Sequence, residues 1–224
     1  MIRLQKQNIP EELASQISQR TTRFLQLNAA AAEVPAALAN AYKTPEVKAL
    51  LRAETSDKCA YCESKVPHVD YGDVEHILPK SVKPELRYDY SNLTYACGIC
   101  NNKKGEYYDA AMPLLDPYRD QPDEHLIAMG PMVFRSPASD RGLLTQKRLD
   151  LNRPSLVEQR AERLEAIATL MDQIARTTND AIKQVLVEQV ERECESDKEY
   201  AFVVRSYVQA TKTLLEQANQ GGAN

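Results

Sequence analysis

The sequence has 224 residues, of which 43% are hydrophobic and 27% charged, as in an ordinary globular protein. The formal net charge of −4 argues against strong nonspecific binding to nucleic acid, because affinity for phosphates comes from clustered lysines and arginines. The sequence shows no apolar run long enough to cross a membrane and no signal-peptide core near its N-terminus. We therefore expect a cytoplasmic protein that has no membrane partner.

Residues 1–56 are predicted to form an N-terminal helical segment. Pro10 is followed by two glutamates, which is typical of the start of a helix. The alanine-rich run that follows is compatible with a helix but is interrupted by Pro35. A further helix is expected to start at Thr44, a capping residue followed by proline, and to continue almost to the first cysteine.

Four of the five cysteines form two CxxC pairs, Cys59 with Cys62 and Cys97 with Cys100. Each pair is the usual two-thiolate hook for one side of a tetrahedral zinc ion. Cysteines of a cytoplasmic protein are reduced, which favours metal binding over disulfides. The four cysteines therefore predict one structural Zn²⁺ in a core that spans residues 57–110.

Two other residues, Cys194 and His68, have side chains that could bind a metal ion. Cys194 stands apart from the two pairs and is expected to be an ordinary helical residue. His68 follows the first pair and could replace a cysteine at the metal, but four thiolates suffice, so we expect it in an exposed loop.

The segment that begins at the first cysteine pair and ends just past the second predicts a strand, a loop, a second strand and a short helix. The strands are expected at residues 73–78 and 91–95, and the helix after Cys100. The first strand carries the adjacent pair Glu75-His76, an arrangement that occurs more often on a plain surface than in an active site. Its position between two zinc hooks favours a chemical role.

The remainder of the chain is predicted in two parts. Residues 111–154 form an irregular, proline-rich connecting region, in which a short β pair could turn at Gly130. Residues 155–224 form a C-terminal helical region with apolar stripes at helical spacing. Capping boxes that begin at Ser155 and Ser196 predict the starts of two of its helices.

The segments DVEHILPKS, YSNL and CGICNNKKG resemble the three parts of an HNH nuclease, whose fold is called ββα-metal. The resemblance implies an α+β, mostly α-helical chain with a zinc-stapled core, N-terminal helices and a C-terminal helical bundle. The segments CAYCE, VEHILPKS and LLDPYRD, with Thr145, residues 149–152 and Arg160, resemble more closely the HNH components of retron and Septu anti-phage systems.

This resemblance implies roles for four catalytic residues. His76 would take a proton from water, and Glu75 and Asn101 would offer oxygen ligands to Mg²⁺ or Mn²⁺. Asn102 is the alternative to Asn101 as a ligand. Asn92 would hydrogen-bond the backbone across the loop between the strands and so hold the histidine in place.

The resemblance also implies a substrate and a partner. Lys80, Lys103 and Lys104 would contact phosphates. The partner would be an ATPase encoded alongside, of the PtuA type, with retron components as a further possibility. We expect DNA as the substrate of the endonuclease. The alternatives are RNA, for example tRNA, and a noncatalytic zinc module that binds nucleic acid or protein.

Overall fold

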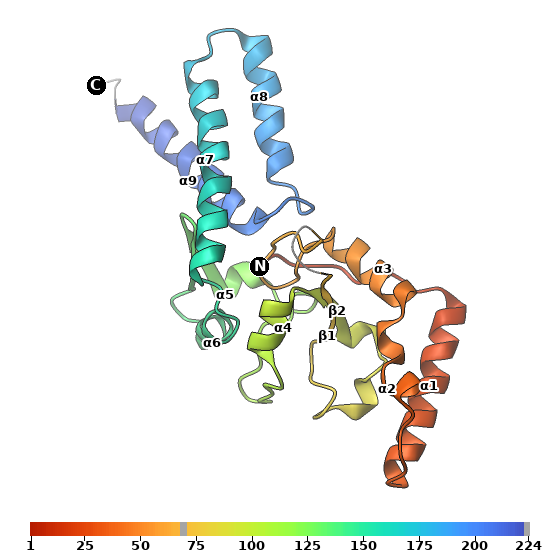
Figure 1. The fold of residues 1–224 in the computed structure, drawn as a ribbon. Coiled ribbons are helices and arrows are strands. Elements are labelled where there is room, and N and C mark those ends of the chain that lie inside the picture. Colours follow the sequence, from red (N-terminus) through yellow and green to blue (C-terminus); the bar gives the residue numbers. More distant parts are fainter. Residues whose placement is uncertain (68–70, 222–224) are drawn as a thin grey trace. The chain divides into compact units, whose positions relative to one another are not determined.

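The computed structural model describes residues 1–67 and 71–221 (Figure 1). The chain divides into two compact units. One consists of Arg3–Asp120, and the other combines Met1–Ile2 with Gln121–Asn224. Within the described residues, no helix is both long and apolar enough to cross a membrane.

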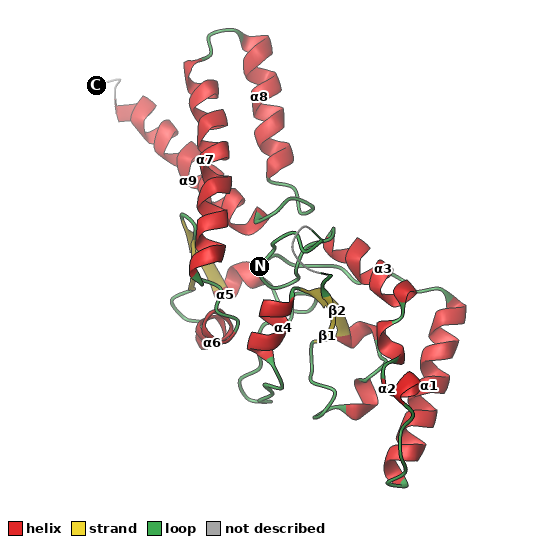
Figure 2. Ribbon diagram, in the orientation of Figure 1, coloured by secondary structure: helices red, strands yellow, loops and turns green. Residues whose placement is uncertain are grey.

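In the unit that spans Arg3–Asp120, the described residues form helices and a two-stranded sheet (Figure 2). Its helices and strands are α1 (Glu11–Ala29), α2 (Ala36–Ala39), α3 (Pro45–Thr55), β1 (Asp73–His76), β2 (Leu93–Ala96) and α4 (Gly98–Lys104). Helix α1 begins directly after Pro10, and α2 begins directly after Pro35. Thr44 caps α3 by accepting a hydrogen bond from the backbone N–H of Val47, which confirms the predicted start of this helix.

Strands β1 and β2 pair in an antiparallel manner, with His76 opposite Leu93. Helix α4 follows β2 and completes the predicted ββα unit. The prediction that this helix starts after Cys100 is wrong, because it already begins at Gly98. The reason is a cap supplied by a metal-site cysteine, since the Cys97 sulfur accepts a hydrogen bond from the backbone N–H of Cys100.

The second unit contains one β-hairpin and several helices. Its elements are α5 (Pro122–His125), β3 (Leu126–Met129), β4 (Met132–Arg135), α6 (Asp140–Arg148), α7 (Pro154–Arg176), α8 (Asp180–Glu193) and α9 (Ala201–Gly221). The hairpin turns at Gly130, as predicted, with a positive φ of 57°. Helix α6 was not expected, because prolines dominate the surrounding sequence. Ser139 starts it by accepting a hydrogen bond from Gly142 N–H.

Both predicted capping boxes in the C-terminal region are wrong. The N-cap of helix α7 is Arg153, two residues before Ser155, and the helix starts at Pro154, so Ser155 lies inside the helix and caps nothing. Ser196 lies in a turn, and its hydroxyl accepts a hydrogen bond from Arg205 instead. Helix α9 begins only at Ala201. Short sequence signatures of a helix start were here overridden by a proline and by a tertiary contact.

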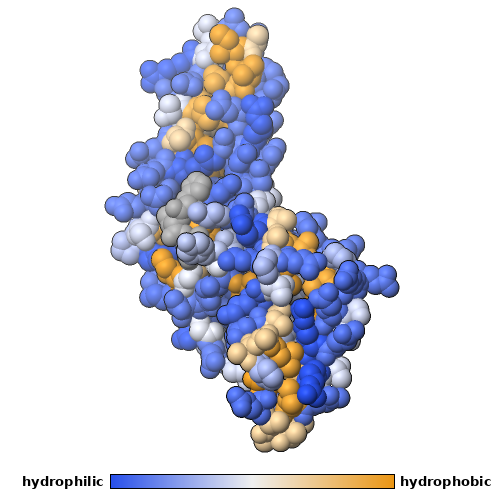
Figure 3. Space-filling model, turned by 45° about the vertical axis from the view of Figure 1, so that its right-hand side comes forward, coloured by the Kyte–Doolittle hydropathy of each residue, from blue (hydrophilic) through white to orange (hydrophobic). Residues whose placement is uncertain are grey.

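Only part of the predicted apolar stripes is buried in a hydrophobic core. Its buried members come from α7, α8 and α9 and are Leu164, Ile167, Met171, Val190, Val204 and Val208. The stripe of α8 is not buried along its whole length, since Ile182 and Val185 are exposed. Figure 3 shows hydrophobic side chains at the surface of the α7–α8 hairpin. These exposed apolar side chains of α8 do not belong to the buried core cluster.

Candidate functional site

The four cysteines of the two CxxC pairs come together in the structure. The Sγ atoms of Cys59, Cys62, Cys97 and Cys100 all lie within 4.8 Å of one another, and all four residues are buried. The Sγ atoms of Cys62 and Cys97 are 3.9 Å apart. A tetrahedral zinc with Zn–S bonds of about 2.3 Å places its sulfurs about 3.8 Å apart. The cluster therefore fits one zinc ion.

The local backbone explains how the first cysteine pair is held. Cys59 N–H donates to the Ser64 carbonyl at 2.9 Å, which closes a tight turn around the pair. Ala60 N–H donates to the Tyr95 carbonyl at 3.0 Å, which joins this turn to strand β2. His68 lies outside the described residues. Cys194 lies in the other unit, just past the end of α8, and has no part in the cluster.

His76 is buried at the end of β1, and its environment fixes which ring nitrogen carries the proton. Its Nε2 atom lies 2.9 Å from the backbone carbonyl oxygen of Arg87. A carbonyl can only accept, so Nε2 donates, and the lone pair of the neutral ring is on Nδ1. The ring of Tyr42 packs edge-on against the imidazole, with centroids 4.5 Å apart.

Burial lowers the pKa of His76 to about 4, and the hydrogen bond to the Arg87 carbonyl opposes this shift. The nearby cations of Lys80, Arg87 and Lys104 lower the pKa further. The imidazole is therefore neutral at pH 7. A neutral imidazole with a defined lone pair can accept a proton from water.

Asn92 makes the backbone contacts expected of it. Its side-chain oxygen accepts from Leu78 N–H at 2.8 Å, and its Nδ2 donates to the Leu78 carbonyl at 3.0 Å. The same Nδ2 lies 3.3 Å from the Leu86 carbonyl. Asn92 is buried and thus holds together the two ends of the loop that follows His76. Asn92 therefore fixes the loop backbone next to His76.

The other face of β1 carries two carboxylates. Asp73 and Glu75 are two residues apart on the strand, so both side chains face helix α4. Asn101 Nδ2 donates to Asp73 Oδ2 at 2.7 Å. This bond uses the amide nitrogen, whereas the amide oxygen is the atom that binds hard cations. Asn102 is exposed on the same helix, whereas Asn101 is half-buried and contacts β1.

Asp73 was not among the predicted site residues, although its spacing from Glu75 on the predicted strand was visible. Two carboxylates and one amide on one face are the donor set that Mg²⁺ and Mn²⁺ prefer. Burial raises the pKa of Glu75, and the Lys104 ammonium opposes the shift. The residues present therefore fit a hard divalent cation.

The three lysines expected to contact phosphates have different surroundings. Lys104 is buried, lies 2.7 Å from Glu75 Oε1 and donates to the His76 carbonyl at 2.7 Å. It cannot reach a phosphate at the surface, so its predicted role is corrected to a contact within the site. Lys80 donates to the Tyr42 hydroxyl at 2.7 Å and is partly accessible. Lys103 is exposed.

Comparison with known proteins agrees with this geometry. The family model described as HNH endonuclease matches residues 59–106, which include the cysteine cluster, both strands and α4. The chain therefore contains an HNH endonuclease domain.

Two curated relatives carry the name Septu protein PtuB. The one from Bacillus thuringiensis is 32% identical over 127 residues, which cover 56% of this chain and 46% of the relative. The one from Bacillus mycoides (strain KBAB4) is 31% identical, and the match covers 54% of this chain and 52% of the relative. The chain thus spans about half the length of the curated relatives it matches.

Proposed function

We propose that the protein is a metal-dependent HNH endonuclease that hydrolyses phosphodiester bonds in DNA. The observation that carries the proposal is the arrangement at the end of β1. There the Nε2–H of His76 is fixed on the Arg87 carbonyl, while on the same strand Asp73 accepts a hydrogen bond from Asn101 of α4 and Glu75 lies 2.7 Å from Lys104 of α4. A noncatalytic zinc module has no need for an imidazole held in one tautomer next to a buried carboxylate, that of Glu75.

The residues of the site divide the reaction among them. His76 Nδ1 accepts a proton from water, and the hydroxide attacks phosphorus in line with the leaving oxygen. Glu75 and Asn101 hold Mg²⁺ or Mn²⁺, and when bound this cation supplies stabilisation of the negative charge that develops on the phosphate. Asp73 orients the amide of Asn101 through their hydrogen bond. Lys80 and Lys103 bind the flanking phosphates.

The proposal is tested by incubating the purified protein with plasmid DNA and with total RNA in Mg²⁺. Cleavage of DNA that EDTA abolishes is the expected result. Cleavage of RNA alone supports the ribonuclease alternative, which the same site would allow because the chemistry reads a phosphodiester and not its sugar. Binding without cleavage of either nucleic acid, with and without the partner ATPase, supports the noncatalytic zinc module.

Replacing Glu75 with glutamine should lower cleavage and be partly rescued by metal. The amide keeps the size of the side chain but removes the charge that attracts the cation, so metal affinity falls. The rate is measured over a titration of Mg²⁺ or Mn²⁺, where the midpoint should rise about tenfold or more. Glu85→Gln, which changes an exposed carboxylate of the same unit, is the matched control and should leave the midpoint unchanged. An unchanged midpoint in Glu75→Gln contradicts the ligand role.

We also propose that the nuclease acts in a bacterial anti-phage system together with an ATPase encoded alongside. The similarity to the proteins named Septu protein PtuB supports this proposal. The charge balance also supports it, because 28 lysines and arginines against 32 acidic residues predict weak intrinsic affinity for nucleic acid. A partner would then supply the missing basic surface.

The exposed apolar residues of α8 are the first place to test for contact with the ATPase. We expect the double change Ile182→Ser and Val185→Ser to weaken co-purification of the two proteins at least tenfold, because both side chains are exposed and apolar. Lys183→Ser with Gln184→Ser, on the same helix, is the control. A complex that survives the apolar double change at full strength excludes this surface as the docking site.

A further inference from the structure

The backbone of His76 has a particular orientation in the two-stranded sheet. Ile77 N–H donates to the Asn92 carbonyl at 2.8 Å, so these neighbours form a hydrogen-bonded position of the ladder. The next pair, His76 with Leu93, is then a non-hydrogen-bonded pair. The carbonyl groups of such a pair point outward, away from the partner strand. Each carbonyl therefore needs a hydrogen-bond donor from outside the sheet.

Two lysines supply these contacts from opposite edges of the sheet. Lys104 of α4 donates to the His76 carbonyl at 2.7 Å. Lys6, from the segment that precedes α1, donates to the Leu93 carbonyl at 2.5 Å. The cross-strand pair that contains the proposed base is thus held between two ammonium groups, one on each side.

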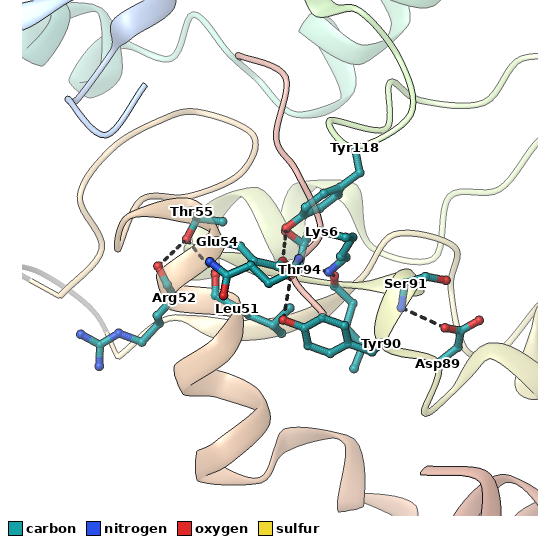
Figure 4. A network of polar contacts seen from close by, with 12 residues as sticks. Lys6, Leu51, Arg52, Glu54, Thr55, Asp89, Tyr90, Ser91, Thr94 and Tyr118 are labelled. Carbon is teal, nitrogen blue, oxygen red and sulfur yellow. Dashed lines mark hydrogen bonds and ion pairs between the residues drawn. The ribbon is translucent and has the colours of Figure 1, made fainter. Parts of the chain in front are cut away.

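The ammonium group of Lys6 has further partners around it, and Figure 4 shows Lys6 beside Tyr90 and Tyr118. Its ammonium lies 3.0 Å from Glu54 Oε2 and sits over two aromatic rings, 4.4 Å from the centroid of Tyr90 and 4.3 Å from that of Tyr118. Cations are attracted to the faces of such rings. The ammonium group therefore has one carboxylate, one carbonyl and two rings around it.

The carboxylate of Glu54 is fixed by its own set of donors. Tyr90 and Tyr118 donate their hydroxyl hydrogens to it at 2.8 and 3.0 Å, and Gln7 N–H donates at 2.8 Å. The Glu54 side chain is completely buried. Tyr118 also contacts the hydroxyl of Thr94 on β2 at 3.0 Å. The network thus connects the N-terminal segment, α3 and Thr94 of β2, which follows Leu93.

Packing the N-terminal segment against the rest of the unit does not by itself require the buried Lys6–Glu54 ion pair. A buried ion pair carries a large desolvation cost, and apolar side chains would hold the segment equally well. What the cation adds is a directed contact to one carbonyl, and that carbonyl is opposite His76. A small displacement of a catalytic group is costly, since a shift of about 1 Å can lower a rate by about a hundredfold.

We propose that Lys6 is a positioning residue that holds β2 so that His76 keeps its catalytic placement. This inference rests on the proposed function, because it assigns Lys6 to the same site. Lys6 does not touch the substrate or the metal ligands and acts through Leu93.

The test replaces Lys6 with methionine, which keeps the length of the side chain but removes the cation. We expect kcat to fall at least tenfold with KM changed less than twofold, at a temperature well below the unfolding midpoint of the variant. Lys147→Met, an exposed lysine of α6, is the matched control and should retain the wild-type kcat. Should Lys6→Met fail to fold, Lys6→Gln keeps a polar group among the two rings and is measured in the same way.

A second measurement follows the imidazole directly. The chain has three histidines, so the Nε2–H signal of His76 can be assigned by NMR from its disappearance in His76→Ala. We expect Lys6→Met to shift this signal and to speed the exchange of its proton with water, and Lys147→Met to leave it unchanged. A folded Lys6 variant with wild-type kcat and an unchanged signal overturns the inference. A wild-type protein without nuclease activity overturns the proposed function, while the NMR comparison still tests Lys6.

Discussion

Replacing His76 with alanine is expected to lower the rate of phosphodiester cleavage by about 10²–10⁴, which is the usual contribution of a positioned general base. The structure gives the reason, because the imidazole is neutral and its Nε2–H is fixed on the Arg87 carbonyl. Trace activity is compatible with this role, since hydroxide can still form slowly beside a bound metal. The measurement is single-turnover cleavage of the substrate identified in the first assays.

This variant needs a control for folding, because His76 packs against Tyr42 and its loss leaves the Arg87 carbonyl without a partner. Thermal unfolding and zinc content should show that the domain remains folded. His125→Ala removes an imidazole from the other unit, where Nδ1 contacts Ser139 at 2.7 Å, and should leave the cleavage rate unchanged. Wild-type cleavage by His76→Ala would refute the assignment of the base.

The parts of the site that could be predicted from the sequence are those encoded by short spacings. Two CxxC pairs imply a metal cluster wherever the chain brings them together, and the structure does bring them together. Asn92 was expected to bond the loop backbone, and it contacts both polar groups of Leu78. The order strand, strand, helix also followed from local patterns.

Contacts between residues far apart in the chain could not be predicted. The distance in sequence from Lys6 to Leu93 is 87 residues, and from Lys6 to Glu54 it is 48. No periodicity or motif signals such a pairing. Lys104 illustrates a related limit, because a lysine at the end of a short helix is usually solvated, whereas here Glu75 and the His76 carbonyl surround it.

Helix starts in the C-terminal region failed for a different reason. The Ser155 motif competes with Pro154, which favours the first helical position and shifts the start by two residues. Residues before α9 are arranged by Arg205, which donates to the Cys194 carbonyl at 2.6 Å and to the Ser196 hydroxyl at 2.8 Å. A local capping signal of about 1 kcal/mol is easily outweighed by such contacts.

The second large effect is expected at the cysteine cluster. We predict one zinc ion per chain, bound by Cys59, Cys62, Cys97 and Cys100, and measurable by metal analysis of the purified protein. The two-stranded sheet beside the cluster is short, with four residues in each strand, so it cannot supply much stability alone. A metal crosslink between the turn at Cys59 and the start of α4 then contributes much of the folding free energy.

Replacing Cys59 with serine should therefore release the zinc and lower the free energy of unfolding by several kcal/mol. Serine is a poor zinc ligand, and the three remaining thiolates would be left as buried charges or protonated thiols. Cys194→Ser is the matched control, because this cysteine lies in the other unit and should change neither zinc content nor the unfolding midpoint. Less than half an equivalent of zinc in the wild-type protein, with no iron in its place, would contradict the assignment.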